Sequence, residues 1–159
     1  MARVDFYHLQ RWPLERALPE LLERVLAGGM RAVVAAGSPE RVRELDGLLW
    51  TYREDSWLPH AAAGDGDPVL QPVWLTAEAE NPNSAEVLVL TDGADFAIAP
   101  PVVRCLDLFD ATVPEHLEAA RARWRRRRAE GHELVYWQQT AEGRWLEKAH
   151  EAGGKGTGA

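Results

Sequence analysis

The chain has 159 residues, of which 46% are hydrophobic and 27% charged, as expected for one globular domain with a sizeable core. No run approaches the roughly 18 consecutive apolar residues of a membrane-spanning helix, and no apolar signal segment follows the first methionine, so we expect a cytoplasmic protein with no membrane contact. The net charge of −7 argues against broad, nonspecific coating of DNA, because duplex binding depends on neutralising several phosphates.

The first half of the chain alternates predicted strands and helices. Residues 3–9 have the alternating pattern of a strand, with Val4 and Phe6 on the face opposite Tyr7. Residues 31–36 are almost continuously apolar, which is typical of a strand buried on both faces. One helix begins at Pro13 and another after Ser38, a good N-cap that is followed by Pro39 at the first helical position. This βαβα order predicts a parallel pair of strands joined by right-handed crossovers in an α/β sheet.

The second half begins with a long connection over residues 52–72, a length that predicts a functional or mobile loop in a compact domain. A further loop is predicted over residues 91–101. The glycine-rich end of the chain lacks the apolar residues needed for a core. We therefore predict one domain over residues 1–148 and a flexible tail over residues 149–159. Strands are expected at 73–75, 86–90, 104–109 and 133–138.

The most distinctive segment is a predicted helix over residues 113–131. Pro114 suits its first turn, and Gly131 suits the position after its last turn. Six arginines and one glutamate give residues 119–131 a net charge of +5 on an acidic chain. Apolar residues recur at helical spacing and predict one core-facing side: Leu117, Ala120 and Trp124.

The arginines of this helix have no acidic neighbours in the sequence that would balance them. Like-charge pairs four residues apart, such as Arg121 and Arg125, slightly destabilise a helix. An uncompensated cluster therefore favours an external anionic partner over a solvated helix face. One stripe combines guanidinium groups with an aromatic wall: Arg121, Trp124, Arg125 and Arg128.

Residues suited to catalysis or cofactor binding form no recognisable pattern. The turn at residues 8–13 lacks the glycine that lets backbone approach a pyrophosphate, and the glycine cluster at 64–67 lacks the Lys-Ser/Thr of a phosphate loop. The five histidines show no metal-ligand spacing, and Cys105 falls in a predicted core strand, where an unreactive thiol is expected. We predict no catalytic residue, no metal site and no cofactor.

Five segments, in order, resemble the chi subunit family of the bacterial DNA polymerase III clamp-loader complex. The resemblance covers roughly residues 3–137, and the most specific signal is L-D-x-x-L-W at 45–50 followed by S-W-L-P-H at 56–60. The family likeness implies a Rossmann-like three-layer α/β sandwich with a mostly parallel central sheet, no nucleotide and no catalytic activity. The other segments are D-F-Y-H-L at 5–9, V-L-V-L at 87–90 and A-R-A-R-W at 120–124.

The same resemblance implies two protein partners and only indirect or weak DNA contact. The first is the acidic C-terminal tail of single-stranded DNA-binding protein. Arg121 matches the family arginine that binds the terminal carboxylate of this tail. The second is the psi subunit, which tethers chi to the clamp loader. Trp50 and Trp57 match family residues on the side that faces psi. Aspartates that precede an apolar residue and a free carboxylate suit guanidinium groups above a small apolar pocket. The residues predicted to bind the tail are Arg121, Trp124 and Arg125, which the resemblance implies, and Arg128, which shares their stripe on the helix.

Two alternatives remain beside this adaptor hypothesis. The arginines could contact nucleic-acid phosphates directly, in which case short oligonucleotides would compete for them. A small nucleotide-binding α/β enzyme is disfavoured by the missing glycine loop. For the adaptor, Arg121→Ala should weaken binding of an acidic, Phe-terminated peptide far more than Arg127→Ala does.

Overall fold

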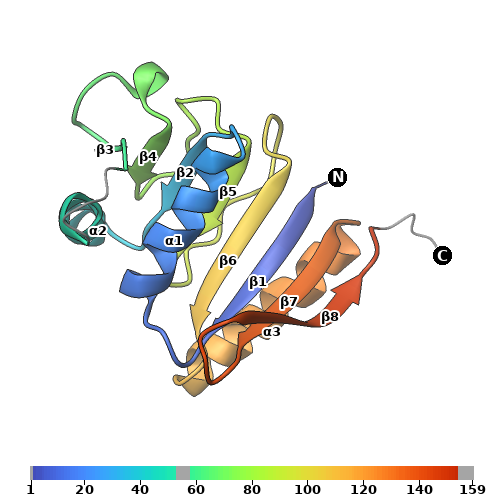
Figure 1. Cartoon of the computed structure of the whole chain (residues 1–159). Coiled ribbons are helices and arrows are strands. Elements are labelled where there is room, and N and C mark those ends of the chain that lie inside the picture. The colour runs from blue at the N-terminus through green and yellow to red at the C-terminus, as the bar shows by residue number, and fades with distance from the viewer. Residues whose placement is uncertain (1, 53–57, 154–159) are drawn as a thin grey trace.

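The computed structural model describes residues 2–52 and 58–153. An eight-stranded sheet forms the centre of the molecule (Figure 1). The described helices are α1 (Leu14–Ala27), α2 (Pro39–Thr51), α3 (Pro114–Ala129) and the short 3₁₀ helix η1 (Pro68–Leu70). The strands are β1 (Arg3–Leu9), β2 (Ala32–Ala35), β3 (Ala61–Ala62), β4 (Val73–Thr76), β5 (Val87–Leu90), β6 (Arg104–Asp110), β7 (Glu133–Gln139) and β8 (Trp145–Glu151).

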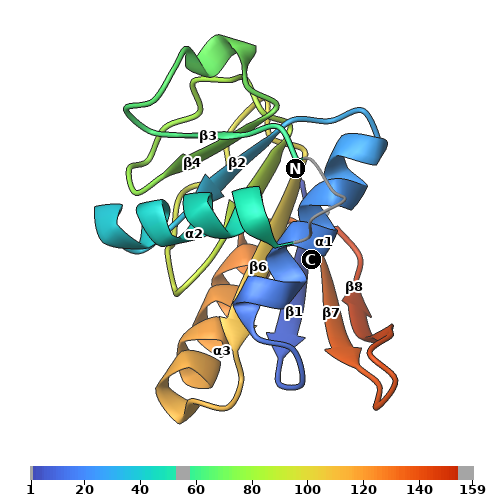
Figure 2. The same ribbon diagram turned by 60° about the vertical axis from the view of Figure 1, so that its left-hand side comes forward.

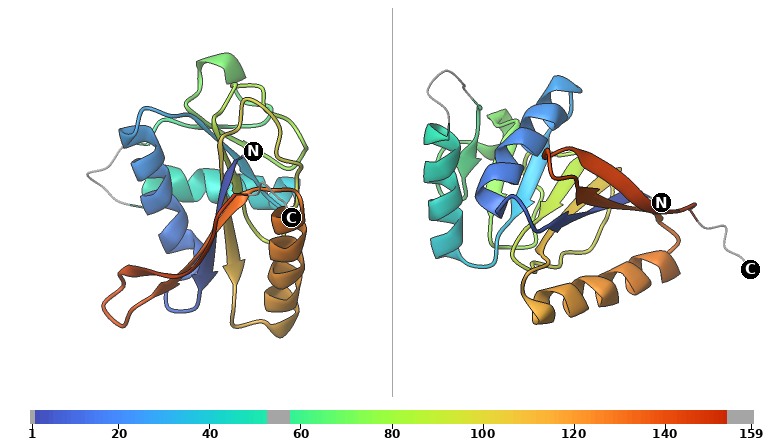
Figure 3. Two further views of the ribbon diagram at one scale, coloured as in Figure 1. Left: turned by 90° about the vertical axis from the view of Figure 1, so that its right-hand side faces the viewer. Right: turned by 60° about the horizontal axis from the view of Figure 1, so that its bottom comes forward.

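The strand order across the sheet is β3-β4-β2-β5-β6-β1-β7-β8. All neighbours are parallel except β7 and β8, which form an antiparallel hairpin at one edge. Helices α1 and α2 cover one face and α3 the other, so the predicted three-layer α/β sandwich with a mostly parallel sheet is confirmed (Figure 3). Within the described part of the chain, no helix is both long and apolar enough to cross a lipid bilayer.

The two faces of the sheet bury separate apolar clusters. On the α1 and α2 side, Leu18, Leu22 and Leu45 pack on alternate residues of the strands. Figure 2 shows α2 in front of β2 and β4, beside α1. On the α3 side, Val4 and Phe6 of β1 lie in a cluster with Ala120 of α3. Helix α3 brings few apolar side chains to this layer. Polar or charged side chains must therefore fill part of the face that α3 turns toward the sheet.

Local sequence signals account for most helix ends. Ser38 accepts a hydrogen bond from the backbone N–H of Arg41 at 3.1 Å, which confirms the predicted N-cap. Pro114 occupies the first turn of α3, and Gly131 follows its end with φ at 89°, a backbone conformation that favours glycine. The predicted bounds of β1 coincide with the observed ones.

Two predictions about connectivity need correction. β1 and β2 are parallel but not neighbours, because β6 and β5 lie between them in the sheet. A sequence pattern shows that a strand is buried on both faces, but it does not show which strand lies beside it. The connection over residues 52–72 is also more structured than predicted, since it contains β3 and η1.

The C-terminal boundary also differs from the prediction. β8 pairs with β7 through Glu151, three residues beyond the predicted domain end at 148. The hairpin turns at Gly143, where φ is 87° and an added Cβ would lie 3.2 Å from the Trp12 ring. The predicted flexibility of the remaining tail stays a prediction, and residues 154–159 lie outside the described part of the chain.

Candidate protein-binding site on helix α3

Two of the six arginines on α3 point into the protein. Arg123 forms a two-point ion pair with Asp107 of β6, with Nε–Oδ2 at 2.7 Å and Nη2–Oδ1 at 3.0 Å. The two side chains are only 6% and 2% exposed. Burial raises the pKa of the Asp107 carboxyl, and the neighbouring Arg123 and Arg127 guanidinium groups act in the opposite direction. This pair attaches the middle of α3 to the sheet.

Arg127 is also buried and anchors the loop before β6. Its Nη2 donates to the Phe96 carbonyl at 2.8 Å and to Asp95 at 3.2 Å. The exposed Arg126 donates to the same Asp95 carboxylate at 2.6 Å. Burial alone would raise the pKa of Asp95, but the hydrogen bond and positive charge of Arg126 lower it. Arg126 and Arg127 therefore have partners within the chain.

The prediction that no acid balances the arginine cluster is thus wrong for half of its members. The balancing residues, Asp95 and Asp107, come from the loop before β6 and from β6 itself. Both lie more than one helical turn before α3 in the sequence, so only the folded structure brings them close to its arginines. The residues that remain available to a ligand are Arg121, Arg125 and Arg128.

These three arginines are exposed and have weak partners or none. The side chain of Arg121 is 61% exposed and lies 3.6 Å from Glu118, itself exposed. The side chain of Arg128 is 65% exposed and lies 3.5 Å from Glu151 of β8. Arg125 is exposed and forms no ion pair within residues 2–52 and 58–153. Exposed pairs of this kind contribute little to stability, so these guanidinium groups remain available for binding.

A hollow of about 370 Å³ lies beside these arginines, between α3 and the β7–β8 hairpin. We call it the α3–β8 groove. The predicted residues Arg121, Trp124 and Arg125 line it, whereas Arg128 reaches it only through its contact with Glu151. The complete lining is Phe6, Phe109, Leu117, Ala120, Arg121, Trp124, Arg125, Tyr136, Ala149 and Glu151.

The floor of the α3–β8 groove is a set of packed aromatic rings. The Trp124 ring lies 5.2 Å from Phe6 and 6.1 Å from Tyr136, measured between ring centroids. The Tyr136 hydroxyl is hydrogen-bonded to His8 Nδ1, which holds that ring in place. An apolar, pre-formed floor with guanidinium groups on its rim suits a ligand that combines an apolar side chain with a carboxylate.

Several groove residues could not be identified as such from the sequence. Strand alternation places Phe6 and Phe109 on one side of their strands, but the sequence does not show that α3 covers that side. Ala149 and Glu151 fell within the predicted tail. The sequence did indicate the two faces of β1. Its alternation predicts Val4 and Phe6 on the face opposite Tyr7, and this prediction is confirmed.

Of the implied psi-binding residues, Trp50 lies on the α2 side of the sheet, away from the α3–β8 groove. Trp50, near the end of α2, is 51% exposed, and its ring centroid lies 4.3 Å from that of His60. His60 is buried, with Nδ1 2.7 Å from the Leu58 carbonyl and Nε2 3.0 Å from Asp46 Oδ1. Trp57 lies outside the described residues. Trp50 is thus an exposed aromatic ring that packs against the buried His60 ring.

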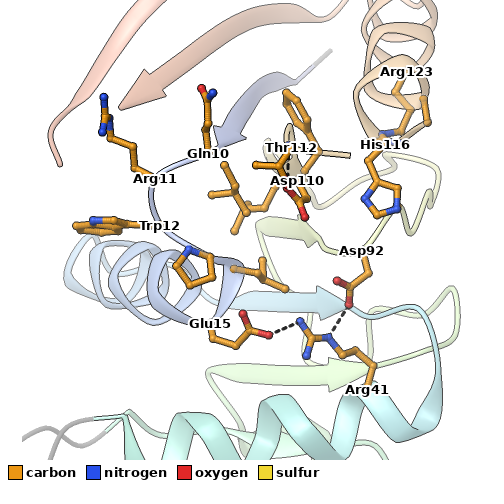
Figure 4. Close-up of a pocket in the computed structure, with 17 residues that line it drawn as sticks. Gln10, Arg11, Trp12, Glu15, Arg41, Asp92, Asp110, Thr112, His116 and Arg123 are labelled. Carbon is orange, nitrogen blue, oxygen red and sulfur yellow. Dashed lines mark hydrogen bonds and ion pairs between the residues drawn. The ribbon is translucent and has the colours of Figure 1, made fainter. Parts of the chain in front are cut away.

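A larger cavity than the α3–β8 groove, about 650 Å³, lies at the carboxyl ends of β1 and β6 (Figure 4). This is where α/β proteins commonly bind nucleotides. Arg41 faces it but is already held by Glu15 at 2.9 Å and Asp92 at 2.8 Å, as the dashed lines in Figure 4 show. Trp12 and Pro13 occupy the turn where a glycine-rich loop would be needed. Of the arginines that line this cavity, only Arg11 has no ion pair within the described residues. The α3–β8 groove has two arginines without a buried partner, Arg121 and Arg125.

Cys105 and the side chains that could bind a metal ion were the other candidates for a reactive site. Cys105 is fully buried on β6, and burial raises the pKa of its thiol, as expected for an unreactive core cysteine. Within the described residues, no group of three or more His, Cys, Asp or Glu side chains is placed to hold a metal ion. The absence of a cofactor stays a prediction.

Comparison with known proteins identifies the family. A family model described as "DNA polymerase III chi subunit, HolC" matches residues 1–135, most of the chain. A curated protein of Rickettsia prowazekii (strain Madrid E), "Probable DNA polymerase III subunit chi", is 30% identical over 97 residues. That alignment covers 61% of this chain and 59% of the relative's length. The chain therefore belongs to the DNA polymerase III chi subunit family.

Proposed function

We propose that this chain is a noncatalytic accessory subunit of DNA polymerase III that acts in the cytoplasm at the replication complex. It joins the clamp loader to single-stranded DNA-binding protein by holding that protein's acidic C-terminal tail in the α3–β8 groove. The observation that carries the proposal is the position of Arg121 and Arg125 on the rim of an aromatic hollow. Neither is buried in an internal ion pair, in contrast to Arg123 and Arg127.

The chemistry of such a tail matches the groove. A terminal carboxylate can accept hydrogen bonds from a guanidinium group, while the last apolar side chain rests on the aromatic floor. The preceding aspartates add attraction that salt screens. A contact of this size should give an affinity on the order of micromolar.

We expect Arg121→Ala to weaken binding of an acidic, Phe-terminated peptide by about tenfold or more, because a charge-assisted hydrogen bond is lost. Calorimetry measures this change, with Arg125→Ala as a second rim variant. Arg43→Ala is the matched control, since Arg43 is an exposed arginine on α2, on the opposite face of the sheet. Arg127 is unsuitable for comparison because it is buried.

Two further ligands separate this proposal from direct nucleic-acid binding. The same peptide with an amidated C-terminus should bind about as weakly to the unaltered protein as the free-acid peptide binds to Arg121→Ala. Short oligonucleotides should not displace the peptide. Equal losses in Arg121→Ala and Arg43→Ala would instead indicate diffuse attraction to exposed arginines on either face of the protein. Full competition by oligonucleotides would indicate that the exposed arginines of α3 bind phosphates.

We propose that the face around Trp50 binds the psi subunit, and that Trp57 takes part. An exposed aromatic side chain on a rigid helix is a common anchor of protein interfaces. Trp50→Ala should lower affinity for the psi subunit by at least about tenfold in a titration followed by fluorescence anisotropy. Leu146→Ala is the control, because Leu146 is similarly exposed, at 48%, on β8. Unchanged psi binding in Trp50→Ala would exclude this face.

A further inference from the structure

The β8 strand builds one wall of the α3–β8 groove, yet it lies beyond the family match, which ends at residue 135. Ala149 and Glu151 of this strand line the groove. Their partners across the hairpin, Tyr136 and Leu134, belong to the apolar cluster on the α3 side of the sheet. A strand outside the matched region therefore supplies part of the candidate binding surface.

Glu151 is the carboxylate among the residues that line this groove. Its Oε1 lies 3.5 Å from Nε of Arg128, and its side chain is 40% exposed. The protein thus places its own negative charge where an acidic ligand would lie, beside one of the three arginines without a buried partner.

From this arrangement we infer that Glu151 is an internal competitor that an acidic ligand must displace from Arg128. The inference rests on the proposed function of the groove and concerns its selectivity. A ligand with a single carboxylate can use Arg121 or Arg125 but gains little at Arg128, which Glu151 occupies. A ligand with several acidic residues can also reach Arg128 but must displace Glu151 there, so Glu151 reduces the affinity of a polyacidic peptide more than that of a monoanion.

A matched control is available on the same strand. The hairpin has a register shift at Tyr136 and Trp137, after which Glu147 pairs with Trp137. The Trp137 ring packs on the α1 side, 6.2 Å from Tyr7. Glu147 therefore lies on the face of β8 opposite Glu151, and its side chain has a similar exposure of 47%. Glu151→Gln and Glu147→Gln change the net charge equally but alter different faces.

The test is calorimetric titration of full-length variants with an acidic, Phe-terminated peptide. Glu151→Gln should bind about two- to fivefold more tightly than the unaltered protein, the range expected for one exposed charge pair, whereas Glu147→Gln should not. In an Arg128→Ala background, Glu151→Gln should bring a smaller gain, because the contested guanidinium is gone. A Phe-terminated peptide without aspartates should gain less from Glu151→Gln than the acidic one.

The outcomes separate this inference from the proposed function. If the peptide binds the unaltered protein and Glu151→Gln behaves like Glu147→Gln, the competitor role is overturned and the proposed function stands. An equal gain with and without Arg128 would also overturn it, since Glu151 would then act only through long-range repulsion. If neither the unaltered protein nor Glu151→Gln binds the peptide, both ideas are wrong.

Discussion

We expect Arg123→Ala to lower the free energy of unfolding by about 3–5 kcal/mol, the usual cost of removing one partner of a buried ion pair. The substitution leaves the Asp107 carboxylate, 1% exposed, without its two-point partner at the centre of the α3 layer. Urea denaturation followed by circular dichroism measures the change from the unfolding midpoint and slope.

The control lies two residues away on the same helix. Arg125→Ala removes the same side chain from an exposed position without an ion pair in the described chain, so it should change stability by no more than about 0.5 kcal/mol. Replacing both partners, as Asp107→Leu with Arg123→Leu, should restore much of the loss, because no charge is then left buried alone. Similar losses for Arg123→Ala and Arg125→Ala would show that the pair does not hold the helix.

This contrast shows why helix α3 is more than a basic surface. Arg123 and Arg127 fix the helix against the sheet and the preceding loop. Their attachment sets the rotation of α3, and that rotation turns Arg121, Trp124 and Arg125 toward the β7–β8 hairpin. The internal ion pairs therefore position the candidate binding surface.

Features encoded by neighbouring residues could be predicted from the sequence. The N-cap at Ser38, the first turn at Pro114 and the glycine that follows α3 are local choices of backbone geometry. The alternation in β1 reported its two faces correctly, because side chains of a strand point to opposite sides in turn. Three members of the predicted tail-binding stripe line one groove for the same reason, since helical spacing placed them together.

Features that depend on distant partners could not be predicted in this way. Six arginines in one helix have similar sequence surroundings, and only the fold shows that Asp107 and Asp95 neutralise three of them. The strand β8 could not be recognised from the sequence, because its residues are mostly charged or small and carry no continuous apolar pattern. Its strand structure depends on pairing with β7, and Glu151 enters the groove only through that pairing.

A second large effect is expected at Asp5, a fully buried carboxylate in the middle of β1. Its Oδ1 accepts hydrogen bonds from Arg3 Nη2 at 3.0 Å and from Trp137 Nε1 at 2.9 Å. Its Oδ2 accepts from Arg104 Nε at 2.8 Å. One side chain therefore connects the three neighbouring strands β1, β6 and β7 on the α1 side of the sheet.

We expect Asp5→Ala to lower the free energy of unfolding by about 2–3 kcal/mol, because Trp137 and both arginines lose their shared acceptor. The cost should stay below that of Arg123→Ala, since Arg3 and Arg104 are 38% and 36% exposed and can be rehydrated. Asp5→Asn keeps one acceptor oxygen and should lose less than Asp5→Ala. Glu118→Ala removes an exposed carboxylate, 69% exposed, and serves as the control in the same urea titrations. An Asp5→Ala loss no larger than the Glu118→Ala loss would mean that β1, β6 and β7 are held by their backbone ladder and apolar packing alone.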